Sequence, residues 1–159
     1  MKSLQLNIPY QSCSFDELSD ADRKLVELAK AACATSYAPY SAFSVGAAVA
    51  LQNGEIVCGS NQENAAYPSG TCAERCAMFY ANARFPNVPP TTIAISACDA
   101  EGHFTPTPIT PCGACRQVLI ETQKRYDQPL RVLLYGERHT LCLDSVSLML
   151  PFQFDADSM

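Results

Sequence analysis

Two short segments decide how this chain is interpreted: residues 71–76 read Thr-Cys-Ala-Glu-Arg-Cys, and residues 111–117 read Pro-Cys-Gly-Ala-Cys-Arg-Gln. Each segment follows a loop that contains Gly or Pro, and each precedes apolar residues at helical spacing. We therefore expect helices over residues 72–84 and 111–124, with Thr71 and Thr110 as their capping residues. Each cysteine group then lies at a helix N-terminus, where free backbone N–H groups stabilise the thiolates that bind zinc.

The cysteines of these segments have the spacing of a zinc site. Cys112 and Cys115 form a C-x-x-C pair whose sulfurs can reach one ion, and Cys72 offers a third ligand from the facing helix. Three protein ligands leave one position open for catalysis, whereas four ligands close a structural site. Cys76 would close it, but we expect a buried small side chain there. A structural zinc site and a set of buried thiols are the alternatives.

Charged residues accompany the cysteines. A carboxylate beside a zinc-activated water moves protons in hydrolysis, and we predict that role for Glu74. Three thiolates around one Zn²⁺ leave a net negative charge, which weakens the metal as a Lewis acid. We expect the guanidinium of Arg75 to donate to the sulfurs and offset this charge. For Arg116 three roles stay open: a helix N-terminal residue, a second sulfur partner or an interface charge.

Outward from these segments the pattern alternates between helices and strands. The predicted elements are a helix over 20–36, a hairpin over 43–51 and 55–60, strands over 92–97, 130–135 and 141–143, and a helical turn over 145–150. This alternation implies an α/β layered domain with a mixed sheet. We expect an irregular N-terminal arm over residues 1–18 and a single domain over 19–159.

The composition is that of one globular domain, with 159 residues of which 48% are hydrophobic and 17% charged. A formal charge of −5 argues against a nucleic-acid partner. The chain has neither an apolar run long enough for a membrane span nor a signal peptide, so we expect a cytoplasmic protein without a membrane partner.

The cysteine count is high and odd, at nine. Without a signal peptide, an odd count argues against a secreted module held together by disulfides. Outside the two segments, the cysteines lie in or near apolar stretches, and we expect them to pack in the core. These residues are Cys13, Cys33, Cys58, Cys98 and Cys142.

Taken together, the motifs resemble those of the zinc-dependent cytidine deaminase family. The similarity extends to residues 40–48 (Tyr-Ser-Ala-Phe-Ser-Val-Gly-Ala-Ala), 61–68 (Asn-Gln-Glu-Asn-Ala-Ala-Tyr-Pro) and 150–154 (Leu-Pro-Phe-Gln-Phe), so it covers roughly residues 20–154. A cysteine as first ligand resembles the branch that acts on free nucleosides. The resemblance implies a three-layer α/β/α domain with a mixed sheet of about five strands. It also implies one Zn²⁺ per chain and a homotetramer whose active sites are shared between subunits.

The resemblance further implies roles for individual residues. The zinc ligands are Cys72, Cys112 and Cys115, with Glu74 as proton shuttle. For the ribose, the resemblance implies hydrogen bonds from Asn61 and Glu63 to the 3′-hydroxyl, with Ala65 and Tyr67 nearby. For the base, it implies packing against Phe43 and contact of the Ala73 backbone with the polar edge. It also implies that Phe154 covers the base in a neighbouring subunit.

The implied reaction is hydrolytic deamination of cytidine and 2′-deoxycytidine to uridine and 2′-deoxyuridine, with release of ammonia, in pyrimidine salvage. The alternatives are a deaminase of a modified cytosine nucleoside such as blasticidin S, and a non-catalytic member that binds zinc or nucleoside. The loop over residues 61–68 favours an ordinary nucleoside. Glu74 favours catalysis, because a binding protein has no need of a proton shuttle. The acidic charge and the cysteine first ligand argue against an editor of nucleic acids.

Overall fold

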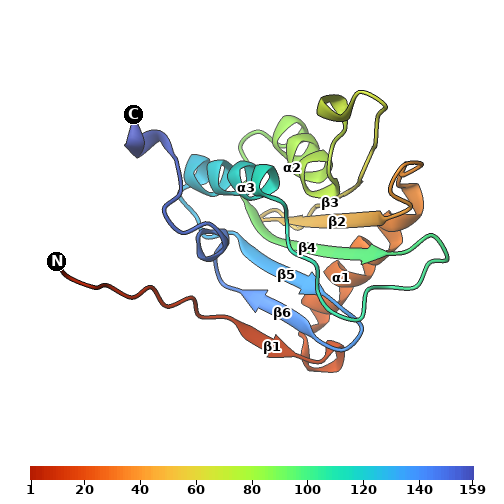
Figure 1. Cartoon of the computed structure of the whole chain (residues 1–159), viewed down its shortest axis with the longest axis horizontal. Coiled ribbons are helices and arrows are strands. Elements are labelled where there is room, and N and C mark those ends of the chain that lie inside the picture. The colour runs from red at the N-terminus through yellow and green to blue at the C-terminus, as the bar shows by residue number, and fades with distance from the viewer.

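The computed structural model describes residues 1–159, which combine α-helices with one mixed sheet (Figure 1). The strands are β1 (Gln11–Cys13), β2 (Ser44–Leu51), β3 (Ile56–Ser60), β4 (Pro90–Cys98), β5 (Arg131–Tyr135) and β6 (Thr140–Leu143). The helices are α1 (Asp20–Ala32), α2 (Ala73–Arg84) and α3 (Gly113–Tyr126). Short 3₁₀ turns cover Phe15–Glu17, Cys33–Thr35, Tyr67–Ser69, Val146–Met149 and Ala156–Ser158.

All the strands belong to one mixed sheet, in the order β1-β6-β5-β4-β2-β3. β4 and β5 are parallel and α3 connects them, whereas every other neighbouring pair is antiparallel. Next to the edge strand β3, Ala48 of β2 lies opposite Cys58 of β3 and Ala94 of β4. The small and apolar residues of β2 suit a strand that is covered on both faces.

Helices cover both faces of the sheet, which gives three layers (Figure 1). α2 and α3 pack over a core that includes Val49 and Ile95. α1 packs on the opposite face, over a core that includes Ala48 and Ala94. Members of the two cores alternate along β2 and β4, because successive side chains of a strand point to opposite faces. The predicted three-layer fold class is confirmed.

Close backbone packing sets the position of α2, the helix that begins just after Cys72. A Cβ atom at Gly59 of β3 would lie 2.5 Å from the backbone nitrogen of Ala77 in α2. Only glycine permits such an approach, so β3 and α2 pack backbone against backbone. This contact holds the N-terminal half of α2 against the sheet.

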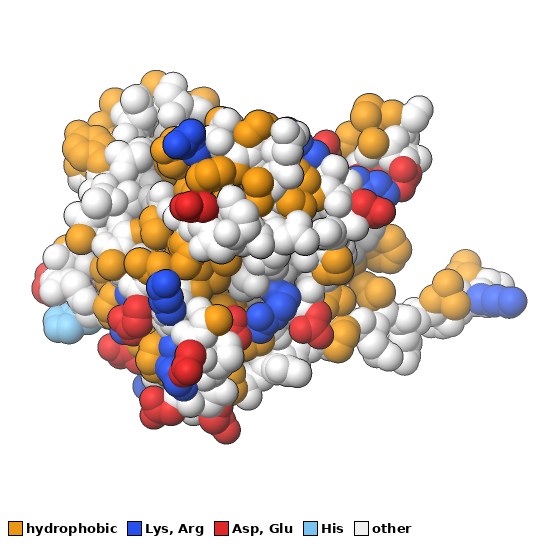
Figure 2. All heavy atoms as spheres, turned by 180° about the vertical axis from the view of Figure 1, so that it is seen from behind, with side chains coloured by type: hydrophobic (Ala, Val, Ile, Leu, Met, Phe, Trp, Pro, Cys, Tyr) orange, Lys and Arg blue, Asp and Glu red, His pale blue; other side chains and the backbone are white.

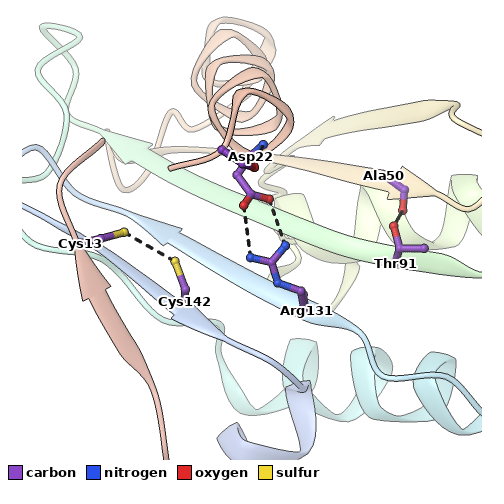
Figure 3. A network of polar contacts seen from close by, with 7 residues as sticks. Cys13, Asp22, Ala50, Thr91, Arg131 and Cys142 are labelled. Carbon is purple, nitrogen blue, oxygen red and sulfur yellow. Dashed lines mark hydrogen bonds and ion pairs between the residues drawn. The ribbon is translucent and has the colours of Figure 1, made fainter. Parts of the chain in front are cut away.

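Polar contacts tie α1 and β1 to the sheet (Figure 3). The guanidinium of Arg131 in β5 donates to both carboxylate oxygens of Asp22 in the first turn of α1, at 3.1 and 3.2 Å. The sulfurs of Cys13 in β1 and Cys142 in β6 lie 3.9 Å apart. These contacts join segments that are far apart in the sequence, so α1 and β1 are parts of the same packed body.

The structure corrects the predicted number of strands. The sheet has six strands rather than about five, because Gln11–Cys13 pairs with Thr140–Cys142 at the edge. Part of the arm that the sequence predicts as irregular therefore forms β1. Three residues are too few to leave an alternating pattern in the sequence, and their pairing depends on a partner at the other end of the chain. Residues 1–10 form neither helix nor strand and extend away from the body (Figure 1).

The helix boundaries also differ from the predicted ones. α1 gives way to a 3₁₀ turn over Cys33–Thr35 instead of continuing to residue 36. The sequence predicts Thr71 and Thr110 as capping residues, but the N-caps of α2 and α3 are Cys72 and Cys112. Both cysteines have an extended backbone, with ψ of 155° and 167°, and neither side chain makes a capping hydrogen bond. Their sulfurs are therefore available to a metal.

The cysteines outside the two segments are not all in the core. Cys33, Cys98 and Cys142 are buried, as expected. Cys13 is half-buried and Cys58 is exposed. The reason is their position in β1 and β3, the two edge strands of the sheet, where one side of the strand has no neighbour.

Charges of both signs are distributed over the surface. Figure 2 shows the side turned away from the viewer in Figure 1, where Lys and Arg alternate with Asp and Glu and form no continuous basic patch. None of the helices combines the length and the apolar character that a membrane span requires.

Candidate zinc centre and active site

The thiols of Cys72, Cys112 and Cys115 meet between the N-termini of α2 and α3. The sulfur of Cys112 lies 3.9 Å from that of Cys72 and 3.5 Å from that of Cys115. All three sulfurs lie within 4.8 Å of one another. A tetrahedral zinc ion with Zn–S bonds of about 2.3 Å holds its sulfurs about 3.8 Å apart. The three sulfurs therefore fit a single zinc ion.

The cluster has a buried side and an open side. Cys115 is in the first turn of α3 and is fully buried. Cys72 is half-buried and Cys112 is exposed. A ligand set of this kind leaves one coordination position toward solvent or substrate, as a catalytic zinc site requires.

Cys72 and Cys115 differ in acidity when no metal is bound. A hydrogen bond from Cys115, with further ones from Arg75 and Cys112, lowers the pKa of Cys72 to about 5. The same contact with Cys72, together with burial, raises the pKa of Cys115. The thiolate of Cys72 therefore forms readily, and zinc binding requires that Cys115 release its proton.

The side chain of Arg75 lies against the first ligand. Its Nη2 is 3.6 Å from the sulfur of Cys72 and 3.5 Å from the carbonyl oxygen of Gly70. The contact with Cys72 raises the pKa of Arg75, and the Nε of Arg75 is buried without a partner. The guanidinium is placed to balance part of the negative charge of the thiolates.

Glu74 lies beside the cluster but is not one of its ligands. It is the second residue of α2, and only 4% of it is exposed. Burial raises the pKa of its carboxyl, and the negative charge of Cys72 acts in the same direction. A carboxyl group with a raised pKa, next to an open metal position, is suited to accept and return a proton.

A cavity of ≈ 240 Å³ opens in front of Cys72 and Arg75. Its other walls come from the loop between β3 and α2. Of the residues predicted to bind substrate, Asn61, Glu63 and Tyr67 line this cavity. The structure therefore brings Cys72, Arg75 and more than half of the loop over residues 61–68 to the same space.

Asn61 and Glu63 also connect that loop to the start of β2. The side-chain oxygen of Asn61 accepts a hydrogen bond from Val45 at 2.8 Å, and its amide group donates to the carbonyl of Phe43 at 2.9 Å. One carboxylate oxygen of Glu63 accepts from the backbone N–H of Tyr40 at 2.9 Å. Each side chain keeps further capacity, because an amide has a second N–H and a carboxylate has a second oxygen.

The other predicted contacts lie outside the cavity lining. Phe43 is half-buried just before β2, Ala73 is fully buried at the start of α2, and Ala65 is exposed. Phe154 is 60% exposed near the C-terminus, and its carbonyl oxygen accepts a hydrogen bond from Gln117 of α3 at 2.8 Å. Its ring is therefore open to contact with another molecule.

Cys76 and Arg116 lie close to the three clustered cysteines in sequence but are not part of the cluster. Cys76 is half-buried one turn after Cys72 and stays outside the group of three sulfurs. The guanidinium of Arg116 donates to the carbonyl groups of Pro111 and Met149 rather than to a sulfur. Sequence patterns do not predict these contacts of Arg116, because Met149 lies 33 residues further along the chain.

Comparisons with known proteins agree with the site. The family model for the cytidine and deoxycytidylate deaminase zinc-binding region matches residues 19–126. A cytidine deaminase of Halalkalibacterium halodurans is 38% identical over 126 residues, which cover 78% of this chain and 86% of the relative. A cytidine deaminase of Sporosarcina psychrophila is 43% identical over 98 residues, which cover 62% of this chain and 67% of the relative.

Solved structures point the same way. The crystal structure of cytidine deaminase from Burkholderia pseudomallei matches with a TM-score of 0.71 and 38% identity, over 86% of this chain and 100% of that chain. With the three-sulfur cluster, the buried glutamate and the match over residues 19–126, this chain belongs to the cytidine and deoxycytidylate deaminase family.

Proposed function

We propose that this chain, with residues 19–159 as its single catalytic domain, catalyses the hydrolytic deamination of cytidine and 2′-deoxycytidine. Water supplies the oxygen at C4 of the base, and the amino group leaves as ammonia, so the products are uridine or 2′-deoxyuridine. The observation that carries the proposal is the group of three thiols within 4.8 Å of one another, beside the buried Glu74. The relatives named cytidine deaminase, at 38% and 43% identity, support it.

Cys72, Cys112 and Cys115 hold one zinc ion per chain. When bound, zinc supplies a Lewis acid that activates water for attack on the base. Glu74 moves both protons of the water: it accepts the first and delivers it to N3 of the cytosine, and then takes the second from the new C4 hydroxyl and delivers it to the departing amine. Arg75, at 3.6 Å from the sulfur of Cys72, limits the charge that the thiolates place on the metal.

The nucleoside lies along the loop between β3 and α2. We assign the ribose 3′-hydroxyl to Asn61 and Glu63, because both line the cavity in front of Cys72 and both have hydrogen-bonding capacity left. Ala65 and Tyr67 lie toward the ribose end. The ring of Tyr67 is 77% exposed, so it has surface to offer to a ligand.

The base is held by residues at the start of β2 and α2 and by a second subunit. We assign Phe43 to packing against the base and the backbone of Ala73 to its polar edge. Phe154 covers the base in a neighbouring subunit of a homotetramer, since its ring is 60% exposed in the single chain. The exposed Phe79 and Tyr80 of α2 offer apolar surface for subunit contacts.

We assign the reaction to pyrimidine salvage in the cytoplasm. The substrate and the product of the proposed reaction are free nucleosides, and all nine cysteines are free thiols. A chain with this many unpaired cysteines is suited to a reducing compartment.

The test is the release of ammonia from cytidine and 2′-deoxycytidine by purified protein of known zinc content. The absorbance change of the cytosine ring is followed in parallel. We expect ammonia and uridine in equal amounts from protein that holds one zinc per chain. No release from either nucleoside, by folded protein that contains zinc, would contradict the proposal. Release from blasticidin S alone would identify a deaminase of modified nucleosides instead.

A further inference from the structure

The loop that leads to Cys112 has few contacts of its own. Residues 107–111 make no backbone–backbone hydrogen bond, and Pro108 and Pro111 have no N–H to donate. Pro108 is fixed by packing, because its nitrogen lies 2.5 Å from where a Cβ atom at Gly136 would be. Thr110 and Pro111, which directly precede the zinc ligand, have no comparable backbone support.

Arg116 supplies hydrogen bonds to this loop from the first turns of α3. Its Nε donates to the carbonyl oxygen of Pro111 at 2.8 Å, and its Nη2 donates to Oγ1 of Thr110 at 3.1 Å. Its Nη1 donates to the carbonyl oxygen of Met149 at 2.8 Å, in the 3₁₀ turn Val146–Met149. The planar guanidinium thus binds three acceptors in two segments, which the single ammonium group of a lysine cannot reproduce.

The next residue of α3 extends this arrangement to the C-terminal segment. Gln117 donates to the carbonyl oxygen of Phe154 at 2.8 Å. Between Met149 and Phe154 the chain turns at Phe152, which has a left-handed φ of 58° and a side chain that is fully exposed. Met149 and Leu150 at the start of the segment pack against the core, whereas Phe152 and Phe154 are exposed. Past Leu150, the hydrogen bond from Gln117 is therefore a main tie between the segment and α3.

We propose that Arg116 is a positioning residue that holds the loop before Cys112 in its metal-binding conformation and couples it to the C-terminal segment 149–154. The inference rests on the zinc site of the proposed function but not on the reaction. Loss of the Arg116 contacts loosens the backbone that carries the ligand and releases the C-terminal segment at the same time. Loss of the Gln117 contact releases the C-terminal segment alone.

The experiment measures zinc loss and proteolysis on the zinc-loaded, full-length protein. Arg116→Lys keeps the charge and removes the planar fork. The matched control is Arg125→Lys at the other end of α3, where the guanidinium makes one hydrogen bond, of 3.4 Å to the carbonyl oxygen of Pro86, and lies over the ring of Tyr126. Transfer of zinc to a chromogenic chelator should be about 10- to 100-fold faster in Arg116→Lys than in the control. Chymotrypsin should also cleave Arg116→Lys faster after Phe152 or Phe154.

Two further variants separate the effects. Gln117→Ala should be cleaved faster in the C-terminal segment while it loses zinc at the wild-type rate. Thr110→Val removes one contact of the loop and should give a smaller increase in zinc loss. If circular dichroism shows that Arg116→Lys does not fold, the zinc-loss rate of Thr110→Val tests the role of the loop contacts instead.

Equal zinc-loss rates in Arg116→Lys, Thr110→Val and the control would overturn the positioning role. Faster zinc loss with unchanged cleavage in Arg116→Lys would overturn the coupling to the C-terminal segment. Neither measurement uses a nucleoside, so a wild-type protein without deaminase activity would count against the proposed function and leave this inference standing.

Discussion

The N-termini of α2 and α3 both present a zinc ligand, but their arginines serve different purposes. Each helix has a cysteine at its N-cap, Cys72 in α2 and Cys112 in α3. Arg75 follows its cysteine by three residues and lies 3.6 Å from the sulfur. Arg116 follows its cysteine by four residues and donates to the carbonyl oxygen of Pro111 at 2.8 Å. A difference of one position thus separates an arginine that contacts the sulfur of its cysteine from one that contacts the backbone before it.

The two helix ends also differ in what else they carry. α2 brings Glu74, the buried carboxyl next to the cluster, and borders the cavity through Cys72 and Arg75. α3 brings Cys115, the fully buried sulfur, and holds the C-terminal segment. Changes at the start of α2 should therefore affect the chemistry first, whereas changes at the start of α3 should affect metal retention first.

The largest effect expected from this comparison is that of Glu74→Gln. The amide keeps the shape of the side chain but cannot move protons, so turnover should fall by at least about 100-fold. The zinc content should stay at the wild-type level, because Glu74 is outside the sulfur cluster. Steady-state kinetics and metal analysis measure both quantities. The matched control is Glu121→Gln, an exposed glutamate of α3, which should keep wild-type turnover. Turnover of Glu74→Gln close to that of the control would refute the assigned role.

Arg75→Gln should have the next largest effect. Without the guanidinium, the negative charge of the thiolates is uncompensated, so we expect turnover to fall by about 10-fold or more. Arg116→Lys should instead change zinc retention more than the turnover of molecules that still hold zinc. The two variants are compared by turnover per bound zinc. An equal loss of turnover per bound zinc in Arg75→Gln and Arg116→Lys would contradict the different roles proposed for the two arginines.

The contact between Arg75 and the sulfur of Cys72 predicts how the alkylation rate of Cys72 depends on pH in the metal-free protein. The pKa of Cys72 is lowered to about 5, so its thiolate is already formed at pH 6 and alkylation should change little between pH 6 and pH 8. In Arg75→Gln the pKa should rise, because one of the groups that stabilise the thiolate is gone. Alkylation of Cys72 should then slow down as the pH falls from 8 to 6. Mass spectrometry of the labelled peptide follows the rate, and parallel pH profiles in both proteins would contradict the contact with Arg75.

The smallest effect is expected for Cys76→Ala. Cys76 lies outside the group of three sulfurs, so zinc content and turnover should stay within about twofold of the wild type. Cys115→Ala, which removes the buried ligand, is the comparison and should lose zinc. A loss of zinc in Cys76→Ala as well would show that this residue closes the coordination sphere.

Local patterns account for what the sequence predicts well. The C-x-x-C pair and its position at a helix start are properties of neighbouring residues. The layered α/β class with a mixed sheet follows from the order of helices and strands, and the three-layer arrangement follows from the family resemblance. The N-caps are Cys72 and Cys112 rather than Thr71 and Thr110. The extended backbone of both cysteines accompanies the meeting of their sulfurs with that of Cys115, a contact between two helices that no local pattern contains. Pairing between Gln11–Cys13 and β6 joins distant parts of the chain, and no local pattern reveals it.

X-ray absorption at the zinc edge of the purified protein tests the central claim most directly. The account predicts three sulfur neighbours at about 2.3 Å and one nitrogen or oxygen neighbour at about 2.0 Å, which leaves an exchangeable position for catalysis. Four sulfur neighbours would identify a closed structural site, and a shell of mainly nitrogen and oxygen would place the metal elsewhere. Either of those results would contradict the open centre between α2 and α3.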